Sequence, residues 1–290
     1  MAERPLPPAS LRAGLRAATA VTRVLGPLRY TLADAVGLGV YALQPERRRR
    51  ATANHRRART GRDDAEARRW ARRSFREYGR TTVDFLWANH LDQARVRRMS
   101  NILGQDHIDA ALDGGKGGVF ALAHHGNWDM AANVATAYGI ELTTVMGPVG
   151  TEWITELVVW AREQNQLEVF TPDNAARGLV RALRRNRFVC LLCDIPESGP
   201  TVVVDYCGGP VEFSAVPAWL ALRTGTPVMP VECYRTGRRR YQIRCNAPVE
   251  VNEGDDEATV MQRVARVLEE GVHRHPGQWY PFRPFYADDR

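Results

Sequence analysis

The stretch that decides the fold is residues 117–139, with the sequence GGVFALAHHGNWDMAANVATAYG. Its first part is a continuous apolar run, which is typical of a strand buried on both faces. The run ends in His124 and His125. Residues 127–139 then have the composition of a helix, and Gly139 is the residue type that commonly follows a last helical turn. A buried strand followed at once by a helix predicts an α/β domain.

The same alternation continues to the end of the chain. We expect further strands at 141–147, 167–172, 188–195, 201–207, 227–235 and 240–251. Helical patterns lie between them at 151–166, 173–187, 214–225 and 256–275. This order predicts the fold class α/β, with a mixed, largely buried central sheet flanked by helices.

The region before this alternation has a different character. Residues 1–100 predict helices, and residues 101–290 predict one continuous α/β core domain. The first helical stretch is apolar but carries four arginines, namely Arg12, Arg16, Arg23 and Arg29. An amphipathic basic helix either lies on an anionic membrane or packs on a core, and both alternatives stay open here.

Charge and length limit the possible partners. The 290 residues carry a formal charge of +7, and Lys116 is the only lysine among 40 basic residues. A basic surface attracts nucleic acid, anionic lipid or an acidic carrier protein. Nucleic acid is not expected, because the arginines are spread over helices without an aromatic-basic module.

Targeting signals are also not expected. We find no secretory signal and no membrane span, since the longest uncharged piece near the start, residues 35–45, is too short for a bilayer. We therefore expect a cytoplasmic protein, attached peripherally to the inner face of the membrane. The five cysteines are expected to be buried free thiols.

The chemistry is expected where the first apolar run ends. Open α/β sheets bind ligands at the carboxyl ends of their strands, which is where His124 lies. Asp129 follows five residues later, in the first helical turn, and the seven histidines give no second pair with this spacing. A carboxylate on one ring nitrogen fixes the tautomer, so the other nitrogen can take a proton from an alcohol. Amide groups at the helix start could stabilise an oxyanion.

Other residues of this region are candidates for substrate contacts. In the motif itself these are His125, Asn127 and Trp128, although a structural role is the stronger alternative for all three. Asp194 and Glu197 follow a predicted strand, and we expect them to contact an acceptor hydroxyl or to orient an arginine. Arg177 and Arg181 share a helical face, which is compatible with binding phosphate.

These stretches resemble a known family. HHGNWD is similar to the HX4D motif of the lysophospholipid acyltransferase superfamily. The similarity is greatest to the branch of lipid A late acyltransferases and phosphatidylinositol mannoside acyltransferases. CDIPESG, YCGGPVEFSAVPAWLALRTGTPVMPVECYR and HPGQWYPFRPF match later blocks of that branch, and the resemblance covers roughly residues 15–285. Two departures are the second histidine in HHGNWD and the absence of an Asp-x-Asp in CDIPES.

The resemblance implies an O-acyltransferase that takes an acyl chain from acyl-CoA or acyl-ACP and needs no cofactor or metal. The acceptor is then a hydroxyl of a lipid or glycolipid. The preference for arginine over lysine indicates a GC-rich genome, which favours a phosphatidylinositol mannoside as the acceptor. His124 is the expected base, and Asp129 is expected to orient it. The alternatives are a thioester hydrolase with the same pair, a metal site at His124, His125 and Asp129, and a non-catalytic lipid- or carrier-binding protein.

The acyl chain needs an apolar channel. We expect a tunnel that opens beside His124 between the GNWD and DIPES segments, lined by Trp128, Trp219 and Leu220. An imidazole paired with a residue other than Asp129 would contradict the route through Asp129 and would favour the non-catalytic alternative.

Overall fold

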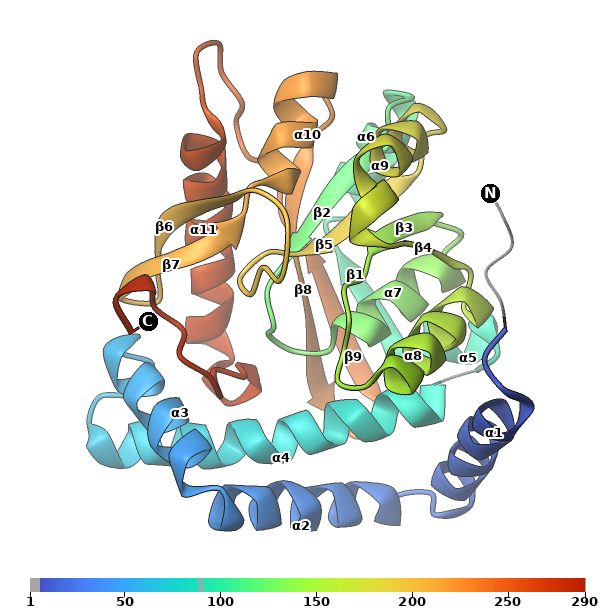
Figure 1. Cartoon of the computed structure of the whole chain (residues 1–290), viewed down its shortest axis with the longest axis vertical. Coiled ribbons are helices and arrows are strands. Elements are labelled where there is room, and N and C mark those ends of the chain that lie inside the picture. The colour runs from blue at the N-terminus through green and yellow to red at the C-terminus, as the bar shows by residue number, and fades with distance from the viewer. Residues whose placement is uncertain (1–5, 89–90, 290) are drawn as a thin grey trace.

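The computed structural model describes residues 6–88 and 91–289. Residues 1–5 and 89–90 of the region predicted to be helical, and residue 290, lie outside the described residues. Within the described part, helices precede the first strand: α1 (Ala9–Val24), α2 (Leu28–Leu43), α3 (Pro45–Arg57), α4 (Asp64–Ala88) and α5 (Gln93–Met99). Figure 1 shows α1, α2 and α3 gathered around the long α4 below the sheet.

The centre of the molecule is a seven-stranded sheet with the order β1-β9-β8-β2-β5-β3-β4. The strands β8 and β9 are antiparallel, and all other neighbours are parallel. The strands are β1 (Ser100–Leu103), β2 (Gly118–Leu122), β3 (Leu142–Val145), β4 (Leu167–Phe170), β5 (Phe188–Leu192), β8 (Val228–Gly237) and β9 (Arg240–Cys245). The predicted mixed, buried sheet is confirmed. The strand β1 was not predicted, because it is short and only half-buried.

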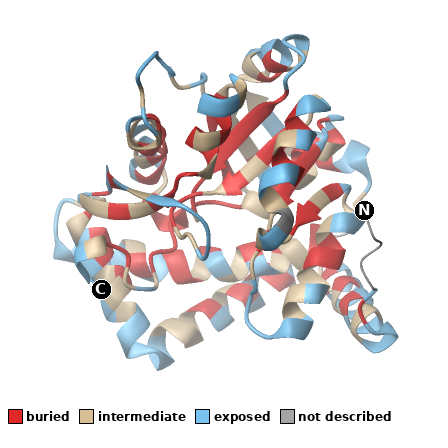
Figure 2. Ribbon diagram, turned by 45° about the horizontal axis from the view of Figure 1, so that its top comes forward, coloured by how far each residue is buried: buried red, intermediate tan, exposed pale blue. Residues whose placement is uncertain are grey.

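Helices cover both faces of this sheet. Residues of α9 (Ala175–Arg184), α10 (Val216–Thr224) and α11 (Glu257–Arg274) form one core with the sheet. A hairpin of β6 (Thr201–Tyr206) and β7 (Gly209–Ser214) joins that core. The opposite core contains residues of α5, α6 (Gln105–Asp113), α7 (Trp128–Ala137) and α8 (Glu152–Gln164). Short 3₁₀ turns lie at Pro172–Asn174, Pro276–Gln278 and Ala287–Asp289. Figure 2 shows the central strands as the buried middle layer.

Burial explains why the strand before the motif has no polar residue. Every residue of β2 is buried, and the side chains alternate between the two cores. Val119 and Ala121 belong to the core with α10 and α11, whereas Phe120 and Leu122 belong to the core with α7. A strand enclosed in this way must be apolar on both faces, as the sequence predicted.

The N-terminal helices are fixed to α4 by close packing. A Cβ at Gly37 of α2 would lie 2.5 Å from the carbonyl oxygen of Phe75, and one at Gly79 of α4 would lie 2.7 Å from that of Ala33. Both distances are too short for a real Cβ, so glycine is required for this approach. Over residues 6–88 and 91–289, no helix has both the length and the apolar character needed to cross a bilayer.

The turn after β2 is held on both sides by backbone contacts. Gly126 has a φ of +70° and forms a bridge with Cys233 of β8, while His125 bridges Trp279. The amide of Gly126 donates to the Gln278 carbonyl oxygen at 2.8 Å. A Cβ at Gly126 would overlap the carbonyl oxygen of Cys233. This turn therefore needs glycine for its dihedral angle and for its space.

Replacing Gly126 should destabilise the fold more than replacing a glycine that has a positive φ but open space around it. We expect Gly126→Ala to lower the free energy of unfolding by about 2 kcal/mol more than Gly139→Ala, because overpacking adds to the strain of a positive φ. Gly139 is a matched control, since it has a φ of +83° and open space around it. Denaturant unfolding of both variants measures the difference, and equal losses would contradict the proposed crowding.

Candidate active site

The register of two neighbouring strands places His124 beside Asp194. The strands β2 and β5 are parallel, with Leu122 opposite Leu192. His124 and Asp194 each come two residues after these partners, so they leave the same edge of the sheet side by side. The peptide N–H of Cys193 continues the pairing by donating to the Leu122 carbonyl oxygen at 2.8 Å.

The two side chains form a close pair. His124 Nδ1 lies 2.8 Å from Asp194 Oδ1, and the backbone amide of His124 donates to both carboxylate oxygens at 3.0 Å. The Asp194 side chain is 1% exposed and that of His124 is 26% exposed. Because an ionised carboxylate can only accept, Nδ1 carries the proton. Nε2 makes no hydrogen bond with any described residue, so the tautomer leaves a basic nitrogen available.

Asp129 has a different partner. Its Oδ1 accepts from Arg162 Nε of α8 at 2.9 Å, and both side chains are largely buried. The predicted contact between His124 and Asp129 is therefore wrong. The physical reason is that Nδ1 of His124 is already bound by the residue across the sheet, while the first turn of α7 directs Asp129 towards α8. Whether Asp129 takes part in catalysis stays a prediction.

The side chain of Asn127 is bound entirely within the protein. It is the N-cap of α7, and its side-chain oxygen accepts from the Met130 amide at 2.9 Å. Its amide nitrogen donates to Asp84 Oδ2 at 3.2 Å, and the residue is 1% exposed. Both ends of this side chain are thus used inside the protein, which explains its place in the motif without a substrate contact.

Trp128 lies directly beside the imidazole. The rings of His124 and Trp128 meet edge to face, with 5.2 Å between their centroids, and Trp128 also contacts Tyr280 at 6.0 Å. The indole is half-buried. It therefore forms a wall of the space into which His124 is exposed, as expected from the sequence.

His125 points away from that space. Its Nε2 donates to the His275 carbonyl oxygen at 3.1 Å, and its ring contacts Tyr234. Burial lowers its pKa to about 4, so the ring is neutral at physiological pH. The alternative in which His124, His125 and Asp129 ligate one metal is wrong, because the last two are bound to different partners. The described residues contain no group of three side chains suited to a metal.

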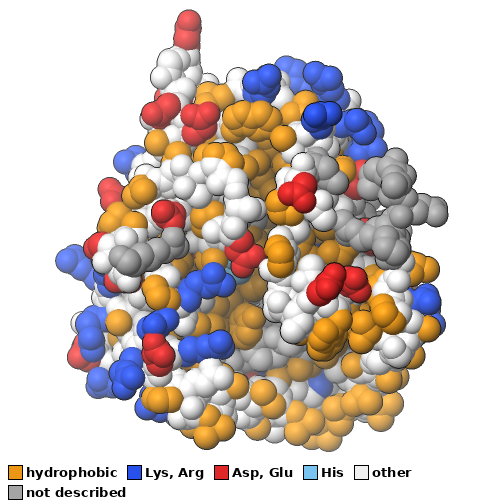
Figure 3. All heavy atoms as spheres, viewed as in Figure 1, with side chains coloured by type: hydrophobic (Ala, Val, Ile, Leu, Met, Phe, Trp, Pro, Cys, Tyr) orange, Lys and Arg blue, Asp and Glu red, His pale blue; other side chains and the backbone are white. Residues whose placement is uncertain are grey.

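Two further candidates are exposed. Glu197 follows Asp194 in the loop after β5, and its carboxylate lies close to Gly147 in the loop after β3. Arg177 lies on the outer face of α9, where Arg181 and Arg184 continue the same stripe. Figure 3 shows basic side chains gathered at the end of the molecule where α9 lies. The described contacts do not bring Glu197 or Arg177 to His124.

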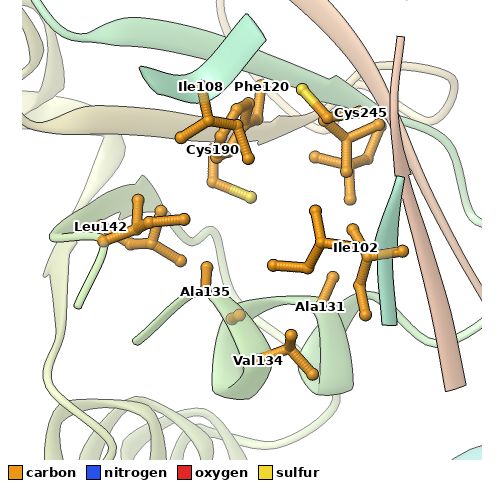
Figure 4. Close-up of a pocket in the computed structure, with 14 residues that line it drawn as sticks. Ile102, Ile108, Phe120, Ala131, Val134, Ala135, Leu142, Cys190 and Cys245 are labelled. Atoms are coloured by element: carbon orange, nitrogen blue, oxygen red, sulfur yellow. The ribbon is translucent and has the colours of Figure 1, made fainter. Parts of the chain in front are cut away.

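An apolar cavity lies under α7, on the face of the sheet that Leu122 and Cys190 share (Figure 4). Figure 4 shows its side chains pointing towards one another from α6, α7 and the strands. The free volume is about 20 Å³, which is small. Leu122 lines this cavity and precedes His124 by two residues. Leu220, by contrast, is fully buried in the opposite core, so the predicted lining by Trp219 and Leu220 of α10 is wrong for this cavity.

One face of the molecule is hollowed. Figure 3 shows a depression in the middle of the face seen in Figure 1, with hydrophobic side chains lining much of it. In that view the loop after β2 lies within its outline. An opening beside His124 that leads into an acyl tunnel stays a prediction.

Sequence reasoning missed three charged residues. Arg162 pairs with Asp129, while Asp84 of α4 and Arg235 of β8 form a buried ion pair behind the motif. In VVWAREQ, Arg162 directly follows the apolar run VVWA, and this position was the available signal for Arg162. Asp84 lies in DFLWA, where a lone acid among apolar residues at the end of a long helix was the corresponding signal.

The chain is similar to known acyltransferases. The chain is 31% identical over 221 residues to the phosphatidylinositol mannoside acyltransferase of Mycobacterium tuberculosis (strain ATCC 25618 / H37Rv). This match covers 74% of the chain and 69% of that protein. The chain is also 31% identical over 225 residues to the enzyme of the same name from Mycolicibacterium smegmatis (strain ATCC 700084 / mc(2)155). This second match covers 75% of the chain and 72% of that enzyme.

The family model of the bacterial lipid A biosynthesis acyltransferases matches residues 13–286. This range includes the β2–α7 motif, Asp194, Arg162 and the C-terminal segment that holds the turn. Because the match extends over nearly the whole chain, the protein belongs to the bacterial lipid A biosynthesis acyltransferase family.

Proposed function

We propose that this acyltransferase moves a fatty acyl chain from acyl-CoA or acyl-ACP to a hydroxyl of a phosphatidylinositol mannoside. The observation that carries the proposal is the pair of His124 and the buried Asp194 at the carboxyl edge of the sheet. The names of the relatives support the acceptor. Both donors present the same thioester, so the pair serves either of them.

The reaction follows from the tautomer. Asp194 holds the proton on Nδ1 of His124, and Nε2 accepts the proton of the acceptor hydroxyl as its oxygen attacks the thioester carbonyl. The tetrahedral intermediate then collapses, the carbon–sulfur bond breaks, and the imidazolium returns the proton to the leaving thiolate. In this proposal Asp194 has the orienting role that we expected for Asp129. His124 therefore still has a carboxylate bound to Nδ1, although it is a different carboxylate from the predicted one.

Positive potential for the oxyanion is available beside the base. The helix α7 begins at Trp128, four residues after His124, so its N-terminal end faces the same edge of the sheet. The Arg162 guanidinium is fixed next to this helix start by Asp129. We propose that these groups stabilise the developing negative charge, and that Asp129 acts by holding Arg162.

The exposed candidates fit the outer parts of the substrates. The stripe of Arg177 and Arg181 on α9 suits the phosphates of a CoA donor or the acidic surface of a carrier protein. Glu197 is placed in the loop that follows Asp194, where it would meet an acceptor hydroxyl. We retain these as substrate-binding proposals.

The competing functions lead to different expectations. A thioester hydrolase would use the same pair on water, so added acceptor would not change the rate of thioester loss. The non-catalytic alternative is favoured by an imidazole whose partner is not Asp129, and His124 meets this condition because it pairs with Asp194. We retain the catalytic proposal because Asp194 is also a carboxylate and can hold the same tautomer. His125, which would fill the donor site of a non-catalytic protein, instead packs against Tyr234 and the His275 carbonyl.

Asp194 and His124 should be needed for turnover. We expect His124→Ala to lower kcat by about 10²–10⁴ and Asp194→Asn by roughly 10² or more, because each removes the oriented base. Asp113→Asn is the control, since it makes the same change at an exposed aspartate of α6. Transfer of labelled palmitate from palmitoyl-CoA to purified phosphatidylinositol mannosides measures the rate. A folded Asp194→Asn variant with wild-type turnover would refute the proposed pair.

We also propose that α1 and α2 dock on an anionic membrane. Large apolar side chains are exposed along these helices: Val21, Val24, Leu28, Leu32, Val36 and Leu43. Figure 3 shows hydrophobic side chains gathered at the lower edge of the molecule, where Figure 1 places α1 and α2. Arg16 and Arg23 are exposed nearby, and so are Arg47 and Arg49 of α3. Arg29 is buried against Trp87, so its predicted place on a basic outer face is wrong.

Charges on this surface should abolish docking. We expect the double variant Leu32→Asp/Val36→Asp to reduce sedimentation with phosphatidylglycerol-containing vesicles more than tenfold, because burial of two such side chains contributes roughly 3–6 kcal/mol. The matched control is Val203→Asp/Leu222→Asp, which adds the same charge at exposed apolar residues elsewhere. Wild-type binding should weaken at high salt and on neutral vesicles. Equal binding of both double variants would show that α2 is not the docking surface.

A further inference from the structure

A buried carboxylate outside the catalytic pair joins four parts of the fold. Asp84 lies near the end of α4 and is 1% exposed. Tyr30 of α2 donates to its Oδ1 at 2.8 Å. Its Oδ2 accepts from Tyr241 of β9 at 2.6 Å, from Asn127 at 3.2 Å and from Arg235 of β8. Two of these donors, Tyr30 and Tyr241, lie 211 positions apart in the sequence.

The charge of Asp84 is compensated inside this cluster. Arg235 is 7% exposed at its side chain, and it also donates to Tyr241 Oη at 3.0 Å and to Glu77 at 3.3 Å. The neighbouring carboxylate raises the pKa of Arg235 well above its usual value, although burial opposes this. Asp84 and Arg235 form an ion pair whose geometry is fixed by these contacts. Charge-assisted hydrogen bonds of this kind are shorter and stronger than neutral ones.

One end of the cluster is the catalytic turn. Asn127 uses its amide nitrogen for Asp84 and its amide oxygen for the Met130 N–H, so Asp84 fixes the orientation of the cap that starts α7. Trp128 is the next residue, and its ring lies against the His124 imidazole. The backbone N–H of Asn127 is bound to the Cys233 carbonyl at 2.8 Å, two residues before Arg235. A change at Asp84 is thus transmitted directly to the wall beside the base.

The other end is the helix with the exposed apolar edge. Tyr30 is buried on the inner side of α2, whereas Leu28, Leu32 and Val36 of the same helix are exposed. The hydrogen bond donated by the Tyr30 hydroxyl connects α2 to Asp84. The close packing of α2 on α4 at Gly37 and Gly79 fixes the distance between the Tyr30 hydroxyl and the Asp84 carboxylate.

We propose that Asp84 is a positioning residue that couples α2 to the catalytic turn through Tyr30 and Asn127. The activity part of this proposal rests on the proposed function of His124. Tyr30 donates to Oδ1 of this carboxylate, whereas Arg235, Tyr241 and Asn127 all donate to Oδ2. Loss of the Tyr30 hydroxyl therefore removes the donor at Oδ1 and lets the carboxylate tilt about the contacts of Oδ2. The expected consequence is a turn that no longer holds Trp128 and His124 in one arrangement, with substrate binding largely preserved.

The decisive substitution is Tyr30→Phe, which removes one hydroxyl on α2 and keeps the ring. We expect kcat to fall roughly 3- to 10-fold with KM unchanged within twofold, the size of effect that loss of one hydrogen bond produces. Tyr41→Phe is the matched control on the same helix. The Tyr41 ring packs on Phe75, and its hydroxyl has no hydrogen bond to a described residue. It should leave kcat and KM at wild-type values.

A double variant tests the path. Asn127→Ser keeps a side-chain oxygen suited to cap α7 and loses the donor to Asp84. If Tyr30 acts through Asp84 and Asn127, Tyr30→Phe should cause no further loss of kcat in the Asn127→Ser background. If kcat of the double variant instead falls by the product of the two single losses, the proposed path is wrong. Wild-type kcat in Tyr30→Phe would overturn it as well.

Hydrogen exchange gives a readout that does not depend on activity. The amides of residues 126–130 should exchange several-fold faster in Tyr30→Phe than in the wild-type protein, and at the wild-type rate in Tyr41→Phe. If no acyl transfer is found, the proposed function fails while this measurement still decides the coupling. Unchanged exchange at the turn in Tyr30→Phe would overturn it.

Discussion

The parallel pairing of β2 with β5 is the constraint on which the site depends. It places residues 124 and 194 at the same level of the same sheet edge, although they are 70 positions apart. The buried Asp194 carboxylate accepts from two N–H groups of one residue, namely the ring Nδ1 and the backbone amide of His124, which is shared between the two carboxylate oxygens. A carboxylate held in this way gives His124 one tautomer and one orientation, which a general base needs.

The remaining contacts of the motif serve to hold this arrangement. Gly126 permits the close approach to β8, and Asn127 closes the start of α7. The C-terminal segment HPGQWYPF has a structural role, because its backbone pairs with His125 and Gly126. Asp129 and Arg162 add a second ion pair at the helix start. The motif is thus a strand-to-helix turn fixed from several directions, with one imidazole left half-exposed.

The sequence predicted the elements of the site but not their pairing. Apolar runs and helical patterns located β2, α7, β5 and α10, and they placed both His124 and Asp194 at strand ends. The partner of His124 was misjudged because the spacing to Asp129 is a local signal, whereas Asp194 is set by strand order and register. Those properties arise from contacts across the whole sheet and leave no mark within a short window. His125 and Asn127 were correctly given a structural alternative, which their burial supports.

The N-terminal helices show the same limit. Their amphipathic pattern was visible, but it could not tell which face packs on the protein. Arg29, counted with the outer basic residues, is stacked between Trp87 and Tyr30, and the exposed edge is made of leucine and valine. The edge strand β1 was missed because four half-buried residues carry little periodicity. In each case the tertiary partner, which is remote in sequence, decided the outcome.

The central claim is that Asp194, and not Asp129, holds the Nδ1 proton of His124. Proton NMR of protein labelled with ¹⁵N-histidine measures this directly, because an Nδ1–H bound to a carboxylate is protected from exchange with water and gives a downfield signal. The account predicts that the His124 signal persists in Asp129→Asn and disappears in Asp194→Asn. Loss of the signal in Asp129→Asn with retention in Asp194→Asn would contradict it.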